Sequence, residues 1–416
     1  MFEVKGEKMN LPNDWIQCNL TDICSIRTGK YDANHAVENG KYRFYTCSTT
    51  YSFCNTKSFE GECIIVPGNG DIGQVYYYDG ELEVYQRTYV LEKICILPRY
   101  LYYHLFWNWR HINSDKQYGS TIRYVRIGNF EKYIVSLPPL PEQHRIVAKI
   151  DALFSELDNG VAFLKTIKAQ LAIYRQAVLK WAFEGKKDYV SFGEITEMRL
   201  GKMLDKNKNK GIPEVYLRNI NVRWFDFDLD DLLEMKFEED EEDKYSIKKG
   251  DLIICEGGEP GRCAIWKSDE TIKYQKALHR VRPKEDWRTE YLMYYMKYIT
   301  NTGVINSFFT GTGIKHLTGE SLKKILVPIC PKPEQLAIVS AIESRLSVCD
   351  KLEQTIDQTL ALSASLRQSI LKKAFEGRLV PQDPNDEPAE KLLERIKAEK
   401  AAVLTKQKQT RKRSLR

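Results

Sequence analysis

The sequence lacks the features that mark several common protein classes. It has no run of 18 uncharged apolar residues, so no transmembrane helix is predicted. Residues 1–7 carry no apolar signal-peptide core, and we expect a cytoplasmic protein with no membrane partner. No Gly-x-x-x-x-Gly-Lys-Ser/Thr element is present, so no P-loop for nucleotide phosphates is predicted.

Cysteine is plentiful, but its spacing argues against metal binding and against a disulfide framework. The ten cysteines include no Cys-x-x-Cys pair and have no matching histidines. Several lie in apolar runs, such as Cys63 before Ile64 and Cys255 after Ile254, where a reduced thiol behaves as a small buried hydrophobe. We expect reduced cysteines and no bound metal.

Catalytic patterns are missing as well. The six histidines show no triad spacing, and the single Pro-Pro pair lacks the flanking residues of an adenine-methyltransferase element. Gly68-Asn69-Gly70-Asp71-Ile72-Gly73 fits the dinucleotide fingerprint, but the aromatic run after it predicts a strand where that site needs a helix. We interpret it instead as a glycine turn that lets the backbone approach another surface. No catalytic residue is predicted.

The net charge of +6 is concentrated at one end of the chain. Residues 391–416 hold ten Lys or Arg against Glu394 and Glu399, a charge of +8, which leaves −2 for residues 1–390. Nucleic-acid binding must therefore rest on local features. The acidic stretch Asp226–Asp243 is expected to be solvated and to face away from nucleic acid.

An internal duplication organises the chain. Residues 141–185 align without a gap to 333–377, with 18 identities in 45 pairs where composition predicts roughly three. Both copies begin Pro-Glu-Gln and end Ala-Phe-Glu-Gly, which is typical of a helix with an acidic first turn and a glycine stop. Each copy is therefore predicted to be one long helix.

The first copy has apolar residues at the 3.5-residue period of a coiled coil. One series is Ile146, Leu153, Gly160, Ile167, Tyr174 and Trp181, and the interleaved series is Ile150, Leu157, Leu164, Leu171 and Val178. The second copy is looser but still one-sided (Ile338, Ile342, Leu346, Leu352, Ile356, Leu360, Leu366, Ile370). We predict that the two helices pair with each other; the alternative is two amphipathic helices packed on separate domains.

The segments before the two helices also resemble each other. Gly61–Asn69 parallels Gly250–Gly258, Tyr85-Gln86-Arg87 parallels Tyr274-Gln275-Lys276, and Gly119–Val125 parallels Gly311–Leu317. Strand-like and helix-like runs alternate in both, so the predicted fold class is α+β, two globular domains separated by two long helices in an internal pseudo-two-fold repeat. The predicted boundaries are domain 1–140, helix 141–190, domain 191–332, helix 333–380 and a basic tail at 381–416.

This order of motifs resembles the specificity subunits of bacterial Type I restriction–modification systems. The resemblance rests on the doubled Pro-x-x-Glu-Gln at Pro139–Gln143 and Pro331–Gln335, the doubled helix endings, and the segment from Arg378 to Lys400. It covers nearly the whole chain, although the central helix has no short tandem repeat such as some relatives use to set spacer length.

The resemblance implies a non-catalytic DNA-binding subunit. Each domain would recognise one half of an interrupted target in double-stranded DNA, and the helices would form an antiparallel coiled coil that acts as a spacer and docks two methyltransferase subunits. Restriction–translocase subunits would join this core, and S-adenosylmethionine, ATP and Mg²⁺ would be needed on the partners only. The alternative is a coiled-coil scaffold without sequence-specific DNA recognition.

Base recognition needs Arg, Lys, Asn or Gln side chains, and phosphate contacts use basic side chains and backbone amides. We expect such contacts from residues in or near the repeated motifs. In the first domain they are Gly68, Asn69, Gly70, Gln86, Arg87, Arg123, Tyr124 and Arg126. In the second domain they are Arg218, Asn219, Gly257, Gly258, Arg262, Gln275, Lys276, Lys315 and His316.

Overall fold

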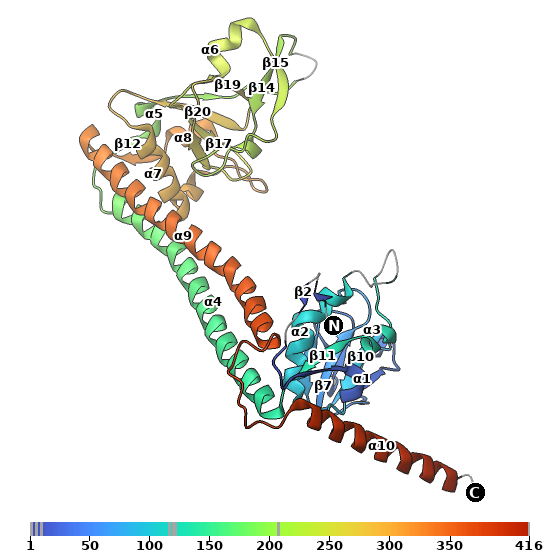
Figure 1. Ribbon diagram of the computed structural model, residues 1–416. Helices are drawn as coiled ribbons and strands as arrows, with labels where there is room; N and C mark the ends of the chain where they lie inside the picture. Colours follow the sequence, from blue (N-terminus) through green and yellow to red (C-terminus); the bar gives the residue numbers. More distant parts are fainter. Residues whose placement is uncertain are drawn as a thin grey trace. The chain divides into compact units, whose positions relative to one another are not determined.

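The computed structural model describes residues 3–4, 7–8, 11–114, 118, 123–205 and 209–414, with the backbone alone for 3–4, 7–8, 404 and 406–414. The chain forms two compact units, one of residues 1–163 and 359–416 and one of residues 164–358. Each unit holds an α+β domain and part of both long helices, α4 (Leu140–Phe183) and α9 (Lys332–Phe375) (Figure 1).

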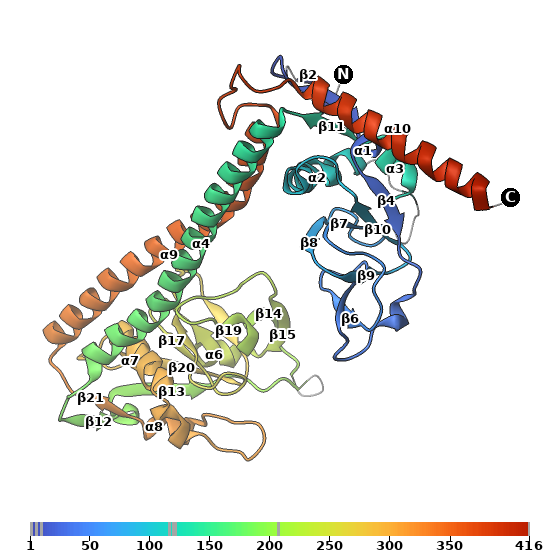
Figure 2. The ribbon, with the colours of Figure 1, turned by 90° about the horizontal axis from the view of Figure 1, so that it is seen from below.

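The first domain is built on a four-stranded antiparallel sheet in the order β4-β10-β7-β8. The sheet's inner face carries Ile64, Val66 and Leu91, which pack against helix α2 (Pro98–Asn113). The domain also has a three-stranded sheet, β6-β5-β9, and a two-stranded sheet, β11-β3 (Figure 2). At the N-terminus β1 (Glu3–Val4) pairs with β2 (Glu7–Lys8). The bounds are β3 Ile16–Asn19, α1 Leu20–Ile23, β4 Ser25–Thr28, β5 Tyr42–Tyr45, β6 Ser52–Cys54, β7 Glu62–Pro67, β8 Tyr76–Asp79, β9 Leu82–Val84, β10 Thr88–Glu92, α3 Ile127–Glu131 and β11 Ile134–Leu137.

The second domain repeats this plan. Its main sheet has the order β13-β20-β17-β18, a second sheet has the order β15-β14-β19-β16, and β12 pairs with β21. Helix α7 (Thr289–Asn301) takes the place of α2, and α5 and α8 take the places of α1 and α3. The bounds are β12 Tyr189–Ser191, α5 Phe192–Ile195, β13 Thr196–Leu200, β14 Ile212–Leu217, β15 Leu233–Phe237, α6 Glu242–Tyr245, β16 Ser246–Ile247, β17 Leu252–Cys255, β18 Cys263–Ile265, β19 Ile272–Tyr274, β20 Leu278–Pro283, α8 Gly319–Lys323 and β21 Leu326–Pro328.

The two long helices are equal in length and end in the same way. Each has 44 residues and is followed by a glycine with positive φ, Gly185 at 78° and Gly377 at 71°. The phenylalanine of each Ala-Phe-Glu-Gly motif is buried at the end of its helix. Phe183 packs against the tyrosines of α7, and Phe375 packs against α2, where it stacks on Trp107. The Ala-Phe-Glu-Gly motif therefore attaches the end of each long helix to one of the two domains.

The Gln of each Pro-x-x-Glu-Gln motif is buried and ties its helix to the adjoining domain. Gln143 accepts a hydrogen bond from the Leu97 N–H (3.1 Å) and donates to the Pro138 carbonyl (2.9 Å). Gln335 likewise accepts from the Arg288 N–H (2.9 Å) and donates to the Cys330 carbonyl (3.0 Å). Both Gln side chains satisfy backbone groups that would otherwise be unpaired, which explains why the motif is repeated.

The helices pair in antiparallel fashion, as predicted. In the unit of residues 164–358, Lys168 contacts Asp357 (2.7 Å) and Arg175, seven residues later, contacts Asp350, seven residues earlier. In the other unit Arg367 pairs with Asp158. Arg367 and Asp158 are the counterparts of Arg175 and Asp350 in the duplication, so the two ion pairs are related by the internal repeat.

The predicted seam is only partly correct. Ile146, Ile150, Leu171 and Val178 are buried, but Tyr174 and Trp181 are exposed, and Leu179, Ala182 and Phe183 are buried instead. In α9, Leu352 and Leu366 are likewise exposed. An α-helix has 3.6 residues per turn, so a strict 3.5-residue series drifts off the buried face over several turns.

The C-terminal segment forms a helix, α10 (Ala389–Ser414), that packs on the first domain. Ala389, Leu392, Leu393 and Ile396 belong to the same core cluster as Trp15 and Leu20. The basic side chains from Lys406 onward lie outside the described residues. The segment is therefore, at least in its first two turns, part of the first domain's core.

Candidate nucleic-acid interface

The structure brings five of the first domain's predicted contact residues together around one cleft. The cleft has a volume of about 430 Å³ and lies beside the ends of β7 and β10. The Gly68 N–H donates to the Arg87 carbonyl (2.9 Å), and the Val125 N–H donates to the Gly68 carbonyl (2.9 Å), so three chain segments meet at this point. The lining residues are Gly68, Gln86, Arg87, Tyr89, Tyr124, Val125 and Arg126.

The remaining predicted residues of this domain border the cleft. Asn69 pairs with Tyr124 in a β-bridge, and the Gly70 N–H donates to the Arg123 carbonyl (3.1 Å). Gly70 has φ of 75°, a conformation that a side chain would strain. We call this set of eight residues the first contact surface: Gly68, Asn69, Gly70, Gln86, Arg87, Arg123, Tyr124 and Arg126.

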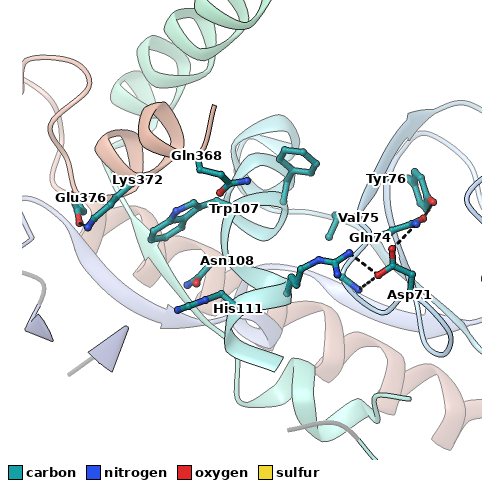
Figure 3. A pocket seen from close by; sticks show the side chains of 13 residues that line it. Asp71, Gln74, Val75, Tyr76, Trp107, Asn108, His111, Gln368, Lys372 and Glu376 are labelled. Atoms are coloured by element: carbon teal, nitrogen blue, oxygen red, sulfur yellow. Dashed lines mark hydrogen bonds and ion pairs between the residues drawn. The ribbon is translucent and has the colours of Figure 1, made fainter. Parts of the chain in front are cut away.

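The loop that follows Gly70 is held in place by contacts with helix α2. Asp71 contacts Arg110 (2.6 Å) and accepts a hydrogen bond from Gln74 (2.9 Å), and these bonds lower the pKa of the Asp71 carboxyl. A larger cleft of about 740 Å³ adjoins the loop; its wall also carries Trp107, Gln368 and Lys372 (Figure 3). The fingerprint-like glycine run leads into strand β8, so the strand that was predicted after it is confirmed.

In the second domain five predicted residues likewise meet. The Asn219 side chain donates to the Gly257 carbonyl, and Arg262 donates to the Asn219 carbonyl (3.1 Å). A Cβ on Gly257 would lie 3.1 Å from His316 Nδ1, and a Cβ on Gly258 would lie 2.6 Å from Asn219 Nδ2. Asn219, Gly257, Gly258, Arg262 and His316, with their exposed neighbours Lys276 and Lys315, form what we call the second contact surface.

The residues that occupy equivalent positions in the two domains differ by one from those that the sequence alignment pairs. The Leu317 N–H donates to the Glu256 carbonyl as the Val125 N–H donates to that of Gly68, so Glu256, not Gly257, is the counterpart of Gly68. The Glu256 N–H bonds the Ala277 carbonyl as the Gly68 N–H bonds that of Arg87. Ala277 therefore replaces Arg87, and Lys276 replaces Gln86.

The core confirms this one-residue shift. Ile64 and Val66 face the main core of the first domain, whereas in the second domain Leu252 and Ile254 do so. Because side chains alternate between the faces of a strand, an alignment error of one residue assigns every side chain to the wrong face. The third match, Gly119–Val125 with Gly311–Leu317, keeps its register, although residues 119–122 lie outside the described part of the chain.

The predicted cations fall into two groups. Arg87, Arg123, Lys276 and Lys315 are exposed, and none forms an ion pair with a described residue. Arg218 and Arg262, in contrast, are neutralised within the domain by Asp231 (2.6 Å) and Glu259 (2.9 Å). The first group is thus available to phosphates or base edges, whereas the second group holds its own loops in place.

Arg126 and Gln275 belong to neither of these groups. The Arg126 guanidinium lies over the ring of Tyr118 (4.3 Å) and donates to the Tyr124 hydroxyl (2.9 Å), which leaves the group exposed but oriented. Gln275 is half-buried, and its N–H donates to the Leu217 carbonyl (3.1 Å). The Gln275 side chain is therefore less accessible than that of Lys276.

Buried polar atoms without a hydrogen-bond partner among the described residues occur on both surfaces. The first surface has Asn69 Oδ1, and the second has Asn219 Oδ1 and Arg262 Nε. Two such atoms lie outside both surfaces, Arg218 Nε and Arg288 Nε. Such atoms are rare in folded proteins and are typical of sites where water or a ligand completes the bonding. Asn69, Arg218, Asn219 and Arg262 are all among the contact residues predicted from the sequence, whereas Arg288 is not.

The acidic stretch Asp226–Asp243 is not simply solvated, which corrects the prediction. Glu238 and Glu241 pair with Lys202, and Glu242 pairs with Lys273; both lysines are nearly fully buried. Hydrogen bonding from Lys202 lowers the pKa of Glu238 to about 2. A buried ammonium group needs a counter-charge, and this stretch supplies it.

Sequence reasoning missed several residues that shape these surfaces. Tyr89 lines the first cleft two positions after Arg87, and the two-residue period of a strand would have indicated it. Trp224 donates to Glu259 (2.6 Å) and so supports the second contact surface. Nothing in the sequence pattern links Trp224 to Glu259, because the contact depends on the tertiary fold.

Comparison with known proteins decides the family. A family model described as the Type I restriction modification DNA specificity domain matches twice, over residues 12–171 and 185–362. The chain belongs to this family. The two matches to this Type I specificity family correspond to the two halves of the duplication.

Relatives of this Type I specificity protein align over most of its length. The EcoDI specificity subunit of Escherichia coli is 30% identical over 97% of this chain and 99% of its own. The EcoKI specificity subunit of E. coli strain K12 is 30% identical over 74% of this chain and 72% of its own.

Two solved structures share the fold. The HsdS subunit from Thermoanaerobacter tengcongensis has a TM-score of 0.63 at 17% identity and covers 91% of this chain and 100% of its own. A chain from a structural study of type I R-M complex assembly has a TM-score of 0.69 at 17% identity and covers 89% of this chain and 100% of its own. Among the described residues of this specificity protein, no helix is long and apolar enough to cross a bilayer.

Proposed function

We propose that this Type I specificity protein recognises a bipartite, interrupted sequence in double-stranded DNA. Residues 1–140 and 191–332 are the two target-recognition domains, and each recognises one half-site through its contact surface. The observation that carries the proposal is that both domains place unpaired cations beside the same backbone junction, Arg87 and Arg123 in one and Lys276 and Lys315 in the other. Divergent side chains on a common frame are suited to two different half-sites.

We further propose that the chain is the non-catalytic member of a larger complex. Its long helices dock two methyltransferase subunits, and restriction–translocase subunits join that core. Exposed apolar side chains on the helices support a docking role, since such groups mark interaction surfaces. They include Phe163 (66% exposed) and Leu362 (66%) in one unit and Ile173 (67%) and Trp181 (58%) in the other. S-adenosylmethionine, ATP and Mg²⁺ act on the partners.

The test is co-expression of the chain with the subunits encoded beside it, followed by genome-wide mapping of N6-methyladenine. The proposal expects methylation within one interrupted motif, present only when this chain is expressed. Methylation that is independent of the chain would contradict the proposal. So would methyl transfer from S-adenosylmethionine by the purified chain alone.

A further inference from the structure

A chain of buried hydrogen bonds lies beneath the first contact surface. Trp109 Nε1 donates to the Ile72 carbonyl (2.9 Å), just after the Gly68–Gly70 turn. The Trp109 carbonyl accepts from Asn113 Nδ2 (2.9 Å), and Asn113 Oδ1 accepts from Asn129 Nδ2 (2.8 Å). Asn129 Oδ1 accepts from the Arg126 N–H (2.9 Å). The bonds therefore connect one DNA-facing loop to the other through the end of α2.

The members of this chain of bonds are shielded from water. Trp109 is 0% exposed, Asn113 1% and Asn129 9%. Buried amides that bond each other in this way are costly to disrupt, because each lost partner leaves a desolvated polar group unpaired. The connection therefore adds a buried link to the two backbone bonds that join the loops directly, from the Gly70 N–H to the Arg123 carbonyl and from the Val125 N–H to the Gly68 carbonyl.

The second domain is built differently at the matched positions. Thr318 and Ser321 correspond to Arg126 and Asn129, and there the Thr318 hydroxyl accepts from the Ser321 N–H (3.3 Å) in an ordinary helix cap. Helix α7 has 13 residues against 16 in α2, so the last turn of α2, which carries Asn113, has no counterpart in α7. Among the described residues, the asparagine connection belongs to the first domain only.

We propose that Asn113 and Asn129 are positioning residues that fix the separation of the Gly68–Gly70 and Arg123–Arg126 loops and thereby set base discrimination at the first half-site. This inference rests on the proposed function. Discrimination between bases depends on placing donors within hydrogen-bond reach of a base edge, so a small change in loop separation weakens it more than it weakens phosphate contacts.

The test uses the full chain in complex with its methyltransferase subunits. Dissociation constants are measured for the cognate DNA and for DNA with one substituted base pair in either half-site. In Asn113→Ala and Asn129→Ala, the preference for the cognate first half-site should fall by at least about fivefold, while the preference at the second half-site stays unchanged. The double variant should fall no further than either single variant, because both break the same connection.

Two further variants separate positioning from folding. Tyr100→Phe removes one buried hydrogen bond of the same domain, from the Tyr100 hydroxyl to the Ser136 carbonyl (2.6 Å), and should change neither preference. In Asn113→Ser the serine hydroxyl can still donate to the Trp109 carbonyl but is too short to reach Asn129. This variant should lose preference for the cognate first half-site, and it provides the test if the alanine variants fail to fold.

Some results would overturn the inference. Unchanged preference at the first half-site in a folded Asn113 variant would do so, as would an equal loss at both half-sites. Because the unsubstituted complex is measured alongside, its tight binding of a bipartite site would leave the proposed function standing in either case.

Discussion

Arg87 and Lys276 are the exposed cations nearest to the paired backbone junctions, yet they are not counterparts of each other. Arg87 occupies the position of Ala277, whereas Lys276 occupies that of Gln86. Arg87 can bond a guanine edge with two parallel donors, whereas a lysine ammonium offers a single point of charge. The two domains therefore present different chemistry at similar places.

Arg87→Ala should weaken specific binding by about 1–3 kcal/mol and relax the preference at one base pair of the first half-site. Lys276→Ala should have a smaller effect and mainly reduce the salt dependence of binding if it contacts phosphate. Titrations at several salt concentrations separate the two outcomes. Arg262→Ala, which breaks an internal ion pair on the second surface, is the matched control for loop disruption. Affinities equal to the parent for both Arg87→Ala and Lys276→Ala would place the contact surfaces elsewhere.

His104 makes the first domain sensitive to acid. Its Nε2 accepts from the Ser136 N–H (3.3 Å), its Nδ1 bonds the Tyr133 hydroxyl (2.9 Å), and burial lowers its pKa from 6.5 to about 3. Between these two values the unfolded chain binds a proton that the folded domain does not, so stability falls as the pH falls.

Urea unfolding between pH 7 and pH 4.5 should therefore show a loss of up to about 1.4 kcal/mol per pH unit from this group. The variant His104→Gln, which does not titrate, should be less stable at pH 7 but should show a shallower dependence on pH. An unchanged slope in this variant would show that His104 is not the acid-sensitive group.

Gln143 and Gln335, at the start of the two long helices, are buried and tie each helix to its domain. Removing the Gln143 side chain leaves the Leu97 N–H and the Pro138 carbonyl unpaired, and removing the Gln335 side chain leaves the Arg288 N–H and the carbonyls of Asp286 and Cys330 unpaired. Each lost partner costs roughly 1–3 kcal/mol. Gln143→Ala and Gln335→Ala should each lower the free energy of unfolding by about 2–4 kcal/mol. Gln176→Ala, at an exposed position of α4, is the control and should change it by less than about 0.5 kcal/mol. Equal effects at all three positions would refute the anchoring role of the motif.

Gly160 is the place to test whether the helices set the distance between half-sites. It is exposed in α4, and a Cβ placed there would touch nothing within 4 Å. Four residues inserted after it add roughly 6 Å of helix, and one base pair advances about 3.4 Å, so the methylated motif should gain one to two spacer base pairs. Two inserted residues would turn the apolar face away from its partner and should reduce solubility. An unaltered spacer in a well-folded four-residue variant would argue for a flexible connection instead.

How much of the fold the sequence predicts depends on the strength of each local pattern. The two long helices were predicted correctly as elements, because Pro and Gly mark the ends of each, but their buried face was predicted only in part. The sequence alignment between the two domains was wrong by one position at strands β7 and β17. Ile64-Ile65 and Ile253-Ile254 are apolar on both faces of these strands, so no alternation of polar and apolar residues fixes the alignment. Tyr174 and Trp181 were assigned to the seam because apolar character alone cannot show where a helix face drifts.

The sequence identified which loops form the candidate site, but it did not show how these loops are held together. Repeated glycine and basic residues identified the loops that meet at Gly68 and Glu256. The side chains that hold these loops, such as Asn113, Asn129 and Trp224, carry no signal in a single sequence. Asn113 and Asn129 bond each other across 16 residues and Trp224 bonds Glu259 across 35, so these contacts arise only in the fold.

At the scale of the whole molecule, the duplication predicts that each domain carries its own DNA preference. Each contact surface is built within one domain and belongs to a separate compact unit. Half-site preference should therefore be transferable with the domain, while the helices and the partner subunits stay the same.

The most direct test replaces residues 1–140 with the corresponding domain of another family member and maps N6-methyladenine in cells that supply the same partner subunits. We expect a new sequence in one half of the methylated motif, with the other half and the spacer length retained. A change in both halves, or retention of the original motif, would contradict the claim that each domain recognises its own half-site.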